Sequence, residues 1–264
     1  MGKIITFATL KGGTGKTTSV FSLGGILGER GFNVLLVDMD PQANLTSNMG
    51  MDETAIGYMG IKNLIEDNRI FPEEVIVKAP IKELSKVDVI GSTVALTATE
   101  MVMIKKPNRE FILSRYLERN KLFFERYDYI LIDTNPSMSI LNQNAFVVSD
   151  GIIVVGDFGV NALKGIELFL AIWGEIVEKL ELPLNIEGIL LNKHEKNELC
   201  REYIEYCCED EEIKRLLFNT YISKSSSIPE AELERRPINI SSKNSKLYLE
   251  FDDFANELLE RLNR

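Results

Sequence analysis

Glycines, lysines and hydroxyl side chains are concentrated near the start of the chain in a combination that suits phosphate binding. The run is Leu10-Lys-Gly-Gly-Thr-Gly-Lys-Thr-Thr18. Its three glycines allow the backbone to approach an anion with the N–H groups directed inward. Lys16 would place a positive charge beside the outer phosphates of a nucleotide, and the Thr17 hydroxyl is a ligand suited to Mg²⁺. The spacing predicts a site for a nucleoside triphosphate and its metal ion.

The segments on either side of this run are suited to hold it in place. Residues 3–9 are mostly apolar and predict a strand, and residues 16–30 predict a helix. The positive end of the helix dipole would add to the attraction for an anion. The usual pattern, Gly-x-x-x-x-Gly-Lys-[Ser/Thr], is matched only in part, because Leu10 replaces its first glycine and a second lysine, Lys11, follows.

Lys-Gly-Gly-Thr-Gly-Lys-Thr-Thr is the deviant Walker A motif, and here the chain resembles the ParA/MinD family of ATPases, in particular the Soj-like ParA partition ATPases. The resemblance implies a P-loop NTPase that uses ATP and Mg²⁺, with residues 10–18 as the P-loop. It also implies an ATP-dependent homodimer that sandwiches the nucleotides, in which Lys11 reaches the phosphates of the partner subunit. Lys11, Lys16 and Asp40 would be the catalytic residues.

Two carboxylates follow the second predicted strand, in the sequence Val37-Asp-Met-Asp-Pro-Gln42. The carboxyl ends of parallel strands are where α/β folds bind ligands, and Pro41 fixes a bend directly after Asp40. A polar turn is the alternative, but the pattern is similar to the family's switch region. By that resemblance Asp40 orients the water that attacks the γ-phosphate, Asp38 and Gln42 support the same region, and Asp38 is a second candidate metal ligand.

The fourth predicted strand ends in a carboxylate, in Tyr127-Asp-Tyr-Ile-Leu-Ile-Asp-Thr-Asn-Pro136. This is the Walker B arrangement, in which Asp133 would hold Mg²⁺ through a water beside Thr17. The family usually has Asp-[Thr/Cys]-Pro-Pro here, so Asn135 replaces the first proline. Because the carboxylate and Pro136 are kept, we expect an intact site with a change in how the next loop moves.

A later strand ends in Ile189-Leu-Leu-Asn-Lys-His194, and its amide side chain suits adenine because it both donates and accepts hydrogen bonds. The resemblance gives Asn192 the adenine-reading role, and a polar strand-end cap is the alternative. His194 is expected to be a loop residue without catalytic partners. The residues expected to bind the nucleotide are Lys11, Gly12, Gly13, Thr14, Gly15, Lys16, Thr17, Thr18, Asn192 and Pro229.

Apolar runs that suit strands alternate with helical patterns along the chain. This alternation predicts an α/β fold, doubly wound, with a mostly parallel sheet flanked by helices. We expect residues 1–264 to form a single P-loop ATPase domain, and residues 47–86 give the least information. Strands are predicted near residues 3–9, 33–37, 87–91, 128–132, 151–156, 186–191 and 219–222.

The composition favours a cytoplasmic protein that is not a general nucleic-acid binder. The chain has a net charge of −10, 45% hydrophobic and 27% charged residues, and no apolar run approaching the roughly 20 residues of a membrane span. Any contact with DNA would therefore need a local patch. Three cysteines and one histidine make a zinc or iron–sulfur site improbable, and Cys200 and Cys207 are expected to be buried on one helix face.

Two stretches are candidate sites for contact with DNA. The first, residues 221–238, resembles a family stretch whose chromosomal members carry DNA-binding arginines, replaced here by Lys224 and Ser227. Lys224, Arg235 and Lys246 are the cations that could still contact phosphates. The second, residues 101–121, has six basic and two acidic residues, which suits either a solvated helix face or a DNA or partner surface.

The C-terminal stretch, residues 245–262, is amphipathic with an acidic polar face, so we expect it to pack on the sheet and not on a membrane. The resemblance then implies a ParA-type ATPase for plasmid or chromosome partition, without the N-terminal helix-turn-helix of some relatives. ATP would drive non-specific DNA binding on the nucleoid, and a ParB-type partner would stimulate weak hydrolysis. The alternatives are a ParA-like ATPase that positions a protein cargo and a MinD-like membrane-associated regulator.

Overall fold

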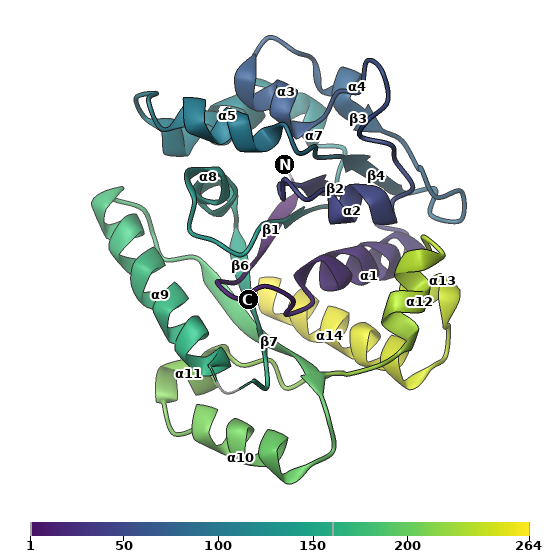
Figure 1. The fold of residues 1–264 in the computed structure, drawn as a ribbon, viewed down its shortest axis with the longest axis vertical. Coiled ribbons are helices and arrows are strands. Elements are labelled where there is room, and N and C mark those ends of the chain that lie inside the picture. Colours follow the sequence, from purple (N-terminus) through teal and green to yellow (C-terminus); the bar gives the residue numbers. More distant parts are fainter. Residues whose placement is uncertain (1, 160, 264) are drawn as a thin grey trace.

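The chain folds around one eight-stranded sheet, described here from a computed structural model that covers residues 2–159 and 161–263 (Figure 1). The strand order is β3-β4-β2-β5-β1-β6-β7-β8, and all neighbours are parallel except β3, which is antiparallel to β4. The strands are β1 (Lys3–Ala8), β2 (Val34–Asp38), β3 (Ile76–Val77), β4 (Val87–Ile90), β5 (Tyr129–Asp133), β6 (Gly151–Asp157), β7 (Ile186–His194) and β8 (Ile222–Ser223).

Helices cover both faces of the sheet, which makes the fold a doubly wound α/β structure (Figure 1). Besides the short 3-10 helix η1 (Arg109–Phe111), the helices are α1 (Lys16–Glu29), α2 (Asn44–Asn48), α3 (Ile61–Glu66), α4 (Pro72–Val75), α5 (Leu96–Met103), α6 (Ile112–Arg119), α7 (Lys121–Phe124), α8 (Ile140–Val148), α9 (Ala162–Lys179), α10 (Glu198–Cys207), α11 (Glu211–Leu216), α12 (Ser227–Leu233), α13 (Ile238–Ser241) and α14 (Lys246–Leu262).

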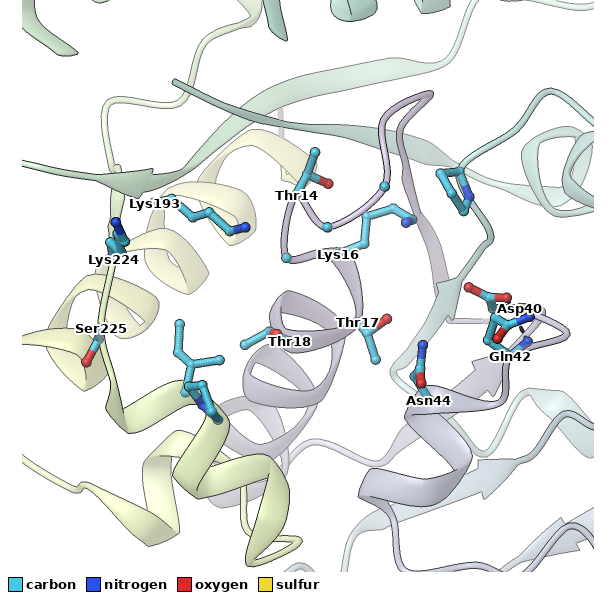
Figure 2. Close-up of a pocket in the computed structure, with 16 residues that line it drawn as sticks. Thr14, Lys16, Thr17, Thr18, Asp40, Gln42, Asn44, Lys193, Lys224 and Ser225 are labelled. Atoms are coloured by element: carbon cyan, nitrogen blue, oxygen red, sulfur yellow. Dashed lines mark hydrogen bonds between the residues drawn. The ribbon is translucent and has the colours of Figure 1, made fainter. Parts of the chain in front are cut away.

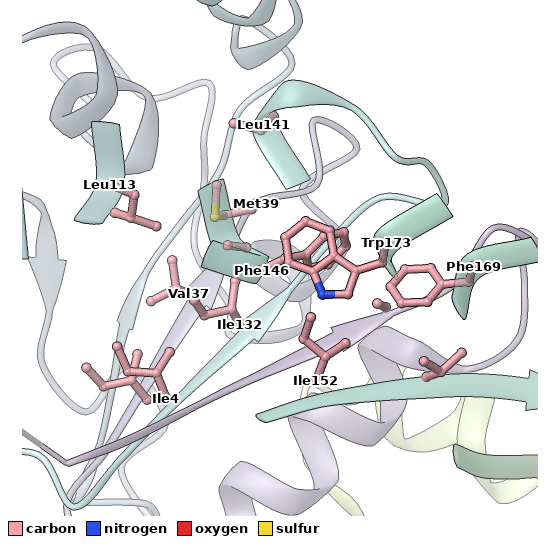
Figure 3. Packing of buried hydrophobic residues seen from close by; sticks show 14 of the residues in the cluster. Ile4, Val37, Met39, Leu113, Ile132, Leu141, Phe146, Ile152, Phe169 and Trp173 are labelled. Carbon is pink, nitrogen blue, oxygen red and sulfur yellow. The ribbon is translucent and has the colours of Figure 1, made fainter. Parts of the chain in front are cut away.

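The sheet has a separate hydrophobic core on each face, because successive side chains of a strand point to opposite faces. On β1, Ile5 and Phe7 pack with α1 and α14, whereas Ile4 and Ala8 face the core shared with α8 and α9. Figure 3 shows the second core, where Trp173 of α9 lies close to aromatic and aliphatic side chains from α8 and the strands. Strands buried on both faces explain the nearly continuous apolar runs in the sequence.

The C-terminal helix packs on the sheet, as its acidic amphipathic pattern predicted. Phe254 of α14 is fully buried, and its ring meets Phe7 and Phe218 edge-on at centroid distances of 6.4 and 4.9 Å. Acidic side chains of the helix hold β8 and the residues before it: Glu250 accepts hydrogen bonds from Ser223, and Glu257 accepts from the N–H groups of Asn219 and Thr220. Among the described residues, no helix combines the length and apolar character that a bilayer crossing requires.

Replacing Phe254 with alanine is expected to lower the free energy of unfolding by about 3–5 kcal/mol, because a buried aromatic ring is lost and a cavity remains. Urea titration followed by circular dichroism measures this change. Leu249→Ala is the matched control on the same helix, since Leu249 is 52% exposed and should cost less than about 0.5 kcal/mol. Equal losses in the two variants would contradict the packing of α14.

Most predicted elements are confirmed, with two differences at the sheet edges. The strand expected at residues 219–222 is instead the short β8, Ile222–Ser223. The antiparallel edge strand β3 was not predicted, because its two residues, Ile76 and Val77, become a strand only by pairing with β4. Cys200 and Cys207 are buried in the core on α10, as expected.

Candidate functional site

The P-loop connects β1 to α1, and its backbone shape depends on glycine. Gly13 and Gly15 have φ angles of 74° and 90°, in the left-handed region that other residues rarely adopt. A Cβ on Gly15 would also lie 2.6 Å from the Nδ2 atom of Asn192. A side chain is therefore excluded there by both backbone conformation and space.

A cavity of about 500 Å³ opens in front of this loop at the carboxyl ends of the strands (Figure 2). Its volume suits a ligand of nucleotide size, since ligand pockets commonly measure about 300–1,000 Å³. Lys16 lies on its wall with only 7% of its surface exposed. The lining residues are Gly12, Gly13, Thr14, Gly15, Lys16, Thr17, Thr18, Asp40, Gln42, Asn44, Pro136, Lys193, Lys224, Ser225, Ile228 and Pro229.

Asp133 and Thr17 meet beside the cavity as the motifs predicted. The Thr17 hydroxyl donates to Oδ2 of Asp133 at 2.6 Å, and Oδ1 of Asp133 is buried with no hydrogen-bond partner among the described residues. Burial raises the pKa of Asp133, whereas the charge of Lys16 and the Thr17 hydrogen bond lower it. A buried carboxylate oxygen without a partner, next to a threonine hydroxyl, fits the oxygen shell of Mg²⁺.

Asp40 lies at the cavity and Asp38 lies behind it. Asp40 accepts a hydrogen bond from the backbone N–H of Gln42 at 2.9 Å, which fixes its carboxylate at the bend (Figure 2). Asp38 is fully buried and accepts from the N–H of Asp40 through Oδ1, and from the N–H and hydroxyl of Thr46 through Oδ2. Burial, followed by the neighbouring charge of Asp133, raises the pKa of Asp38.

Both carboxylate oxygens of Asp38 are thus occupied by the protein, and the residue does not line the cavity. This arrangement favours a role in shaping the Asp40 turn over the candidate role as a metal ligand. Thr46 extends the same network by accepting from the N–H of Ser92 at 2.8 Å. The second strand and the segment after β4 are therefore tied together behind Asp40.

Lys11 does not line the cavity in front of the P-loop. Its ammonium group donates to both carboxylate oxygens of Asp157, at 2.8 and 2.9 Å, and its side chain is 42% exposed. Asp157 lies at the end of β6, 146 residues away along the chain, so the sequence motif gave no sign of this pairing. The expected contact of Lys11 with a partner's phosphates stays a prediction.

Asn192 lies under the P-loop at the end of β7. Its Nδ2 atom donates to the backbone oxygen of Thr14 at 3.0 Å and lies 3.2 Å from the hydroxyl of Ser19, so the side chain braces the loop. Its Oδ1 atom is buried with no partner among the described residues. The sequence did not indicate this bracing role. The adenine-reading role stays a prediction, and it would require Oδ1 to accept a hydrogen bond from the base.

Pro229 lines the cavity from α12, and the same helix touches the P-loop through a contact that the sequence did not indicate. Glu232 accepts a hydrogen bond from the Thr18 hydroxyl at 2.6 Å. His194 is the last residue of β7, where its ring stacks near Phe158 and Tyr221. The expectation that His194 is a loop residue was wrong, because it ends a strand and its ring packs against neighbouring aromatic rings.

The candidate DNA contacts lie at different places on the surface. Lys224 pairs with Glu195 at 2.8 Å and lines the nucleotide cavity, and Lys246 pairs with Glu250 at 2.9 Å. Arg235 is exposed just beyond α12. In the second basic stretch, residues 101–121, several cations bond to backbone oxygens, so part of that positive charge serves the local structure.

The sequence comparisons identify relatives over the full chain. The model of the AAA domain family matches residues 2–186. The sporulation initiation inhibitor protein Soj of Bacillus subtilis is 33% identical over 266 residues, which cover 98% of this chain and 98% of Soj. The chromosome partitioning protein ParA of Myxococcus xanthus is 30% identical, covering 99% of this chain and 89% of that protein.

Solved structures show the same architecture. A Borrelia burgdorferi B31 protein, described as a candidate plasmid partition protein and bound to AMPPNP, has a TM-score of 0.80 and 26% identity, covering 98% of this chain and 99% of that one. Cobyrinic acid a,c-diamide synthase of Mycobacterium smegmatis, bound to an ATP analogue and magnesium, has a TM-score of 0.82 and 25% identity, covering 98% and 95%. The motifs, the fold and the full-length relatives agree: the chain belongs to the ParA/MinD family of P-loop ATPases.

Proposed function

We propose that this protein is a ParA-type partition ATPase whose ATP-bound homodimer binds DNA without sequence preference. The observation that carries the proposal is the position of Lys11. Its ammonium group lies outside the cavity of its own subunit, on a partly exposed side chain. A lysine that belongs to a phosphate-binding motif but lies outside the cavity could contact the phosphates of a nucleotide bound to a second copy of the protein.

ATP would occupy the cavity with its phosphates on the P-loop and its base toward Ile228 and Pro229. The N–H groups of the loop and the ammonium of Lys16 would hold the phosphates. Thr17 and, through a water, Asp133 would hold Mg²⁺, which neutralises phosphate charge when bound. The adenine-reading role of Asn192 is an expectation from the family resemblance: its Oδ1 has no partner among the described residues, but it is buried and Asn192 does not line the cavity.

Hydrolysis would depend on positioning more than on base strength. Asp40 is fixed at the bend by its hydrogen bond to Gln42 and by the Asp38 network, so its carboxylate can orient a water for in-line attack on the γ-phosphate. The positive charge that stabilises the transition state would come from Lys11 of the second copy. A single subunit lacks this charge at its own site, and weak intrinsic ATPase activity follows.

DNA binding would use local cations on a protein of net charge −10. Lys224, Arg235 and Lys246 are the proposed phosphate contacts, and the dimer would be nucleoid-associated when ATP is bound. The side chains of Lys224 and Lys246 are exposed, and ion pairs of exposed lysines contribute little to stability, so phosphates can compete for these lysines. A ParB-type protein is the proposed partner that stimulates hydrolysis and releases the DNA.

A MinD-like membrane role is less well supported by the C-terminal helix. The apolar side chains of α14, among them Phe251, Phe254 and Leu258, are buried in the core and are not available to lipid. A membrane-bound amphipathic helix needs a free apolar face.

Light scattering with Mg²⁺ and ATP, ADP or no nucleotide tests the proposed dimer. We expect a doubling of mass with ATP only, and a monomer for Lys11→Ala under all three conditions. A monomer for the unaltered protein with saturating ATP would contradict the proposal.

A further inference from the structure

Lys193 occupies an unusual backbone position at the end of β7. In the pairing with β8, Asn192 lies opposite Ile222 and His194 lies opposite Ser223, so Lys193 is an extra residue in the strand. Its φ angle is 63°, in the left-handed region that favours glycine. Bulges of this kind redirect a side chain and are frequent beside active sites.

The side chain of Lys193 is directed into the nucleotide cavity. It lines the cavity together with P-loop residues, and Figure 2 shows it extending from the strand end toward the loop at Thr14. Within the described part of the chain, Lys193 makes no side-chain hydrogen bond and no ion pair. Lys224, which also lines the cavity, differs because its ammonium group is held by Glu195 at 2.8 Å.

We propose that Lys193 binds the phosphate chain of the nucleotide within its own subunit. The inference rests on the proposed function in that it takes the cavity to be the ATP site. An unpaired ammonium group at the cavity wall is a compact charge that suits a phosphate oxygen. Lys193 would act from the end of β7, whereas Lys16 acts from the start of α1. Neither lysine would need a second copy of the protein, in contrast to the role proposed for Lys11.

The backbone conformation supports a role for the side chain. Glycine would suit the bulge without strain, whereas a lysine there adopts an unfavourable conformation. At the bulge, the side chain of Asn192 lies under the P-loop and the side chain of Lys193 lies at the cavity. The same backbone bulge therefore positions both residues. Bracing of the loop by Asn192 and charge from Lys193 would then act together on the phosphates.

Nucleotide affinity in a Lys11→Ala background tests the proposal without any contribution from a partner's lysine. Lys193→Gln in that background should weaken ATP and ADP binding about tenfold or more, as expected for loss of one charge-assisted contact. Lys193→Arg keeps the charge and should stay within about threefold of the Lys11→Ala parent. Lys196→Gln, an exposed neighbour that does not line the cavity, is the control and should have no effect.

Adenosine, measured by competition, separates phosphate contact from base contact. Its affinity should not change in Lys193→Gln, because it has no phosphate. Unchanged ATP affinity, or an equal loss for adenosine and ATP, would overturn the proposal while leaving the ATP site intact. Failure of the unaltered protein to bind ATP would instead overturn the proposed function as well.

Discussion

Replacing Lys16 with alanine is expected to weaken ATP binding by at least about a hundredfold. Lys16 is buried on the cavity wall, with 7% of its surface exposed, so its charge acts on phosphate with little screening by solvent. Truncating one member of a buried charge pair commonly costs about 2–5 kcal/mol, and each 1.4 kcal/mol is a factor of ten in affinity. Its loss also removes the positive charge that lowers the pKa of Asp133.

Isothermal titration with ATP and Mg²⁺ measures this effect. Lys164→Ala is the matched control, because Lys164 is an exposed lysine of α9 that does not line the cavity. Thermal unfolding of both variants verifies that they fold. Undiminished ATP affinity in Lys16→Ala would refute the assignment of the cavity.

Asp40→Ala is expected to reduce ATP turnover by about a hundredfold or more while ATP binding is retained. The carboxylate lies at the cavity on a bend fixed by two hydrogen bonds, and a side chain placed to orient the attacking water and accept its proton contributes roughly 10²–10⁴ in rate. No phosphate contact is assigned to Asp40, so its removal should not weaken binding. The variant should therefore accumulate as an ATP-bound dimer.

Steady-state phosphate release and light scattering together measure the two parts of this prediction. Asp52→Ala, at an exposed aspartate in the following loop, is the control and should keep normal turnover. If Asp40→Ala hydrolysed ATP at the normal rate, the water-positioning role would be wrong. A monomer with saturating ATP and Mg²⁺ would count against the trapped dimer.

The parts of the fold that could be predicted from sequence are those set by local pattern. Strands such as β2 and β6 are continuous apolar runs because both faces of the sheet are covered, and the resulting α/β alternation identifies the fold. The edge strand β3 could not be predicted, since two residues carry no pattern of their own and pair only through β4. Tertiary pairing also makes β8 begin three residues later and end one residue later than expected.

In the candidate site, too, the residues that could be predicted are those that belong to local motifs. The P-loop, Asp40 and Asp133 follow from short motifs at strand ends, because the carboxyl edge of a parallel sheet brings such ends together. The pairing of Lys11 with Asp157, the bracing of the P-loop by Asn192 and the contact of Thr18 with Glu232 join distant segments. The position of Lys193 depends on a bulge that no turn residue marks in the sequence.

The most direct test of the proposed ATP-dependent DNA binding is equilibrium binding to unrelated duplex DNA with ATP, with ADP and without nucleotide, across a series of salt concentrations. We expect binding with ATP only, a steep loss with salt because phosphate contacts dominate, and no binding by Lys11→Ala. Equal binding in all three nucleotide states would contradict it. An ATP-dependent dimer that binds no DNA would also contradict it, and would show that the local cations do not overcome the acidic surface.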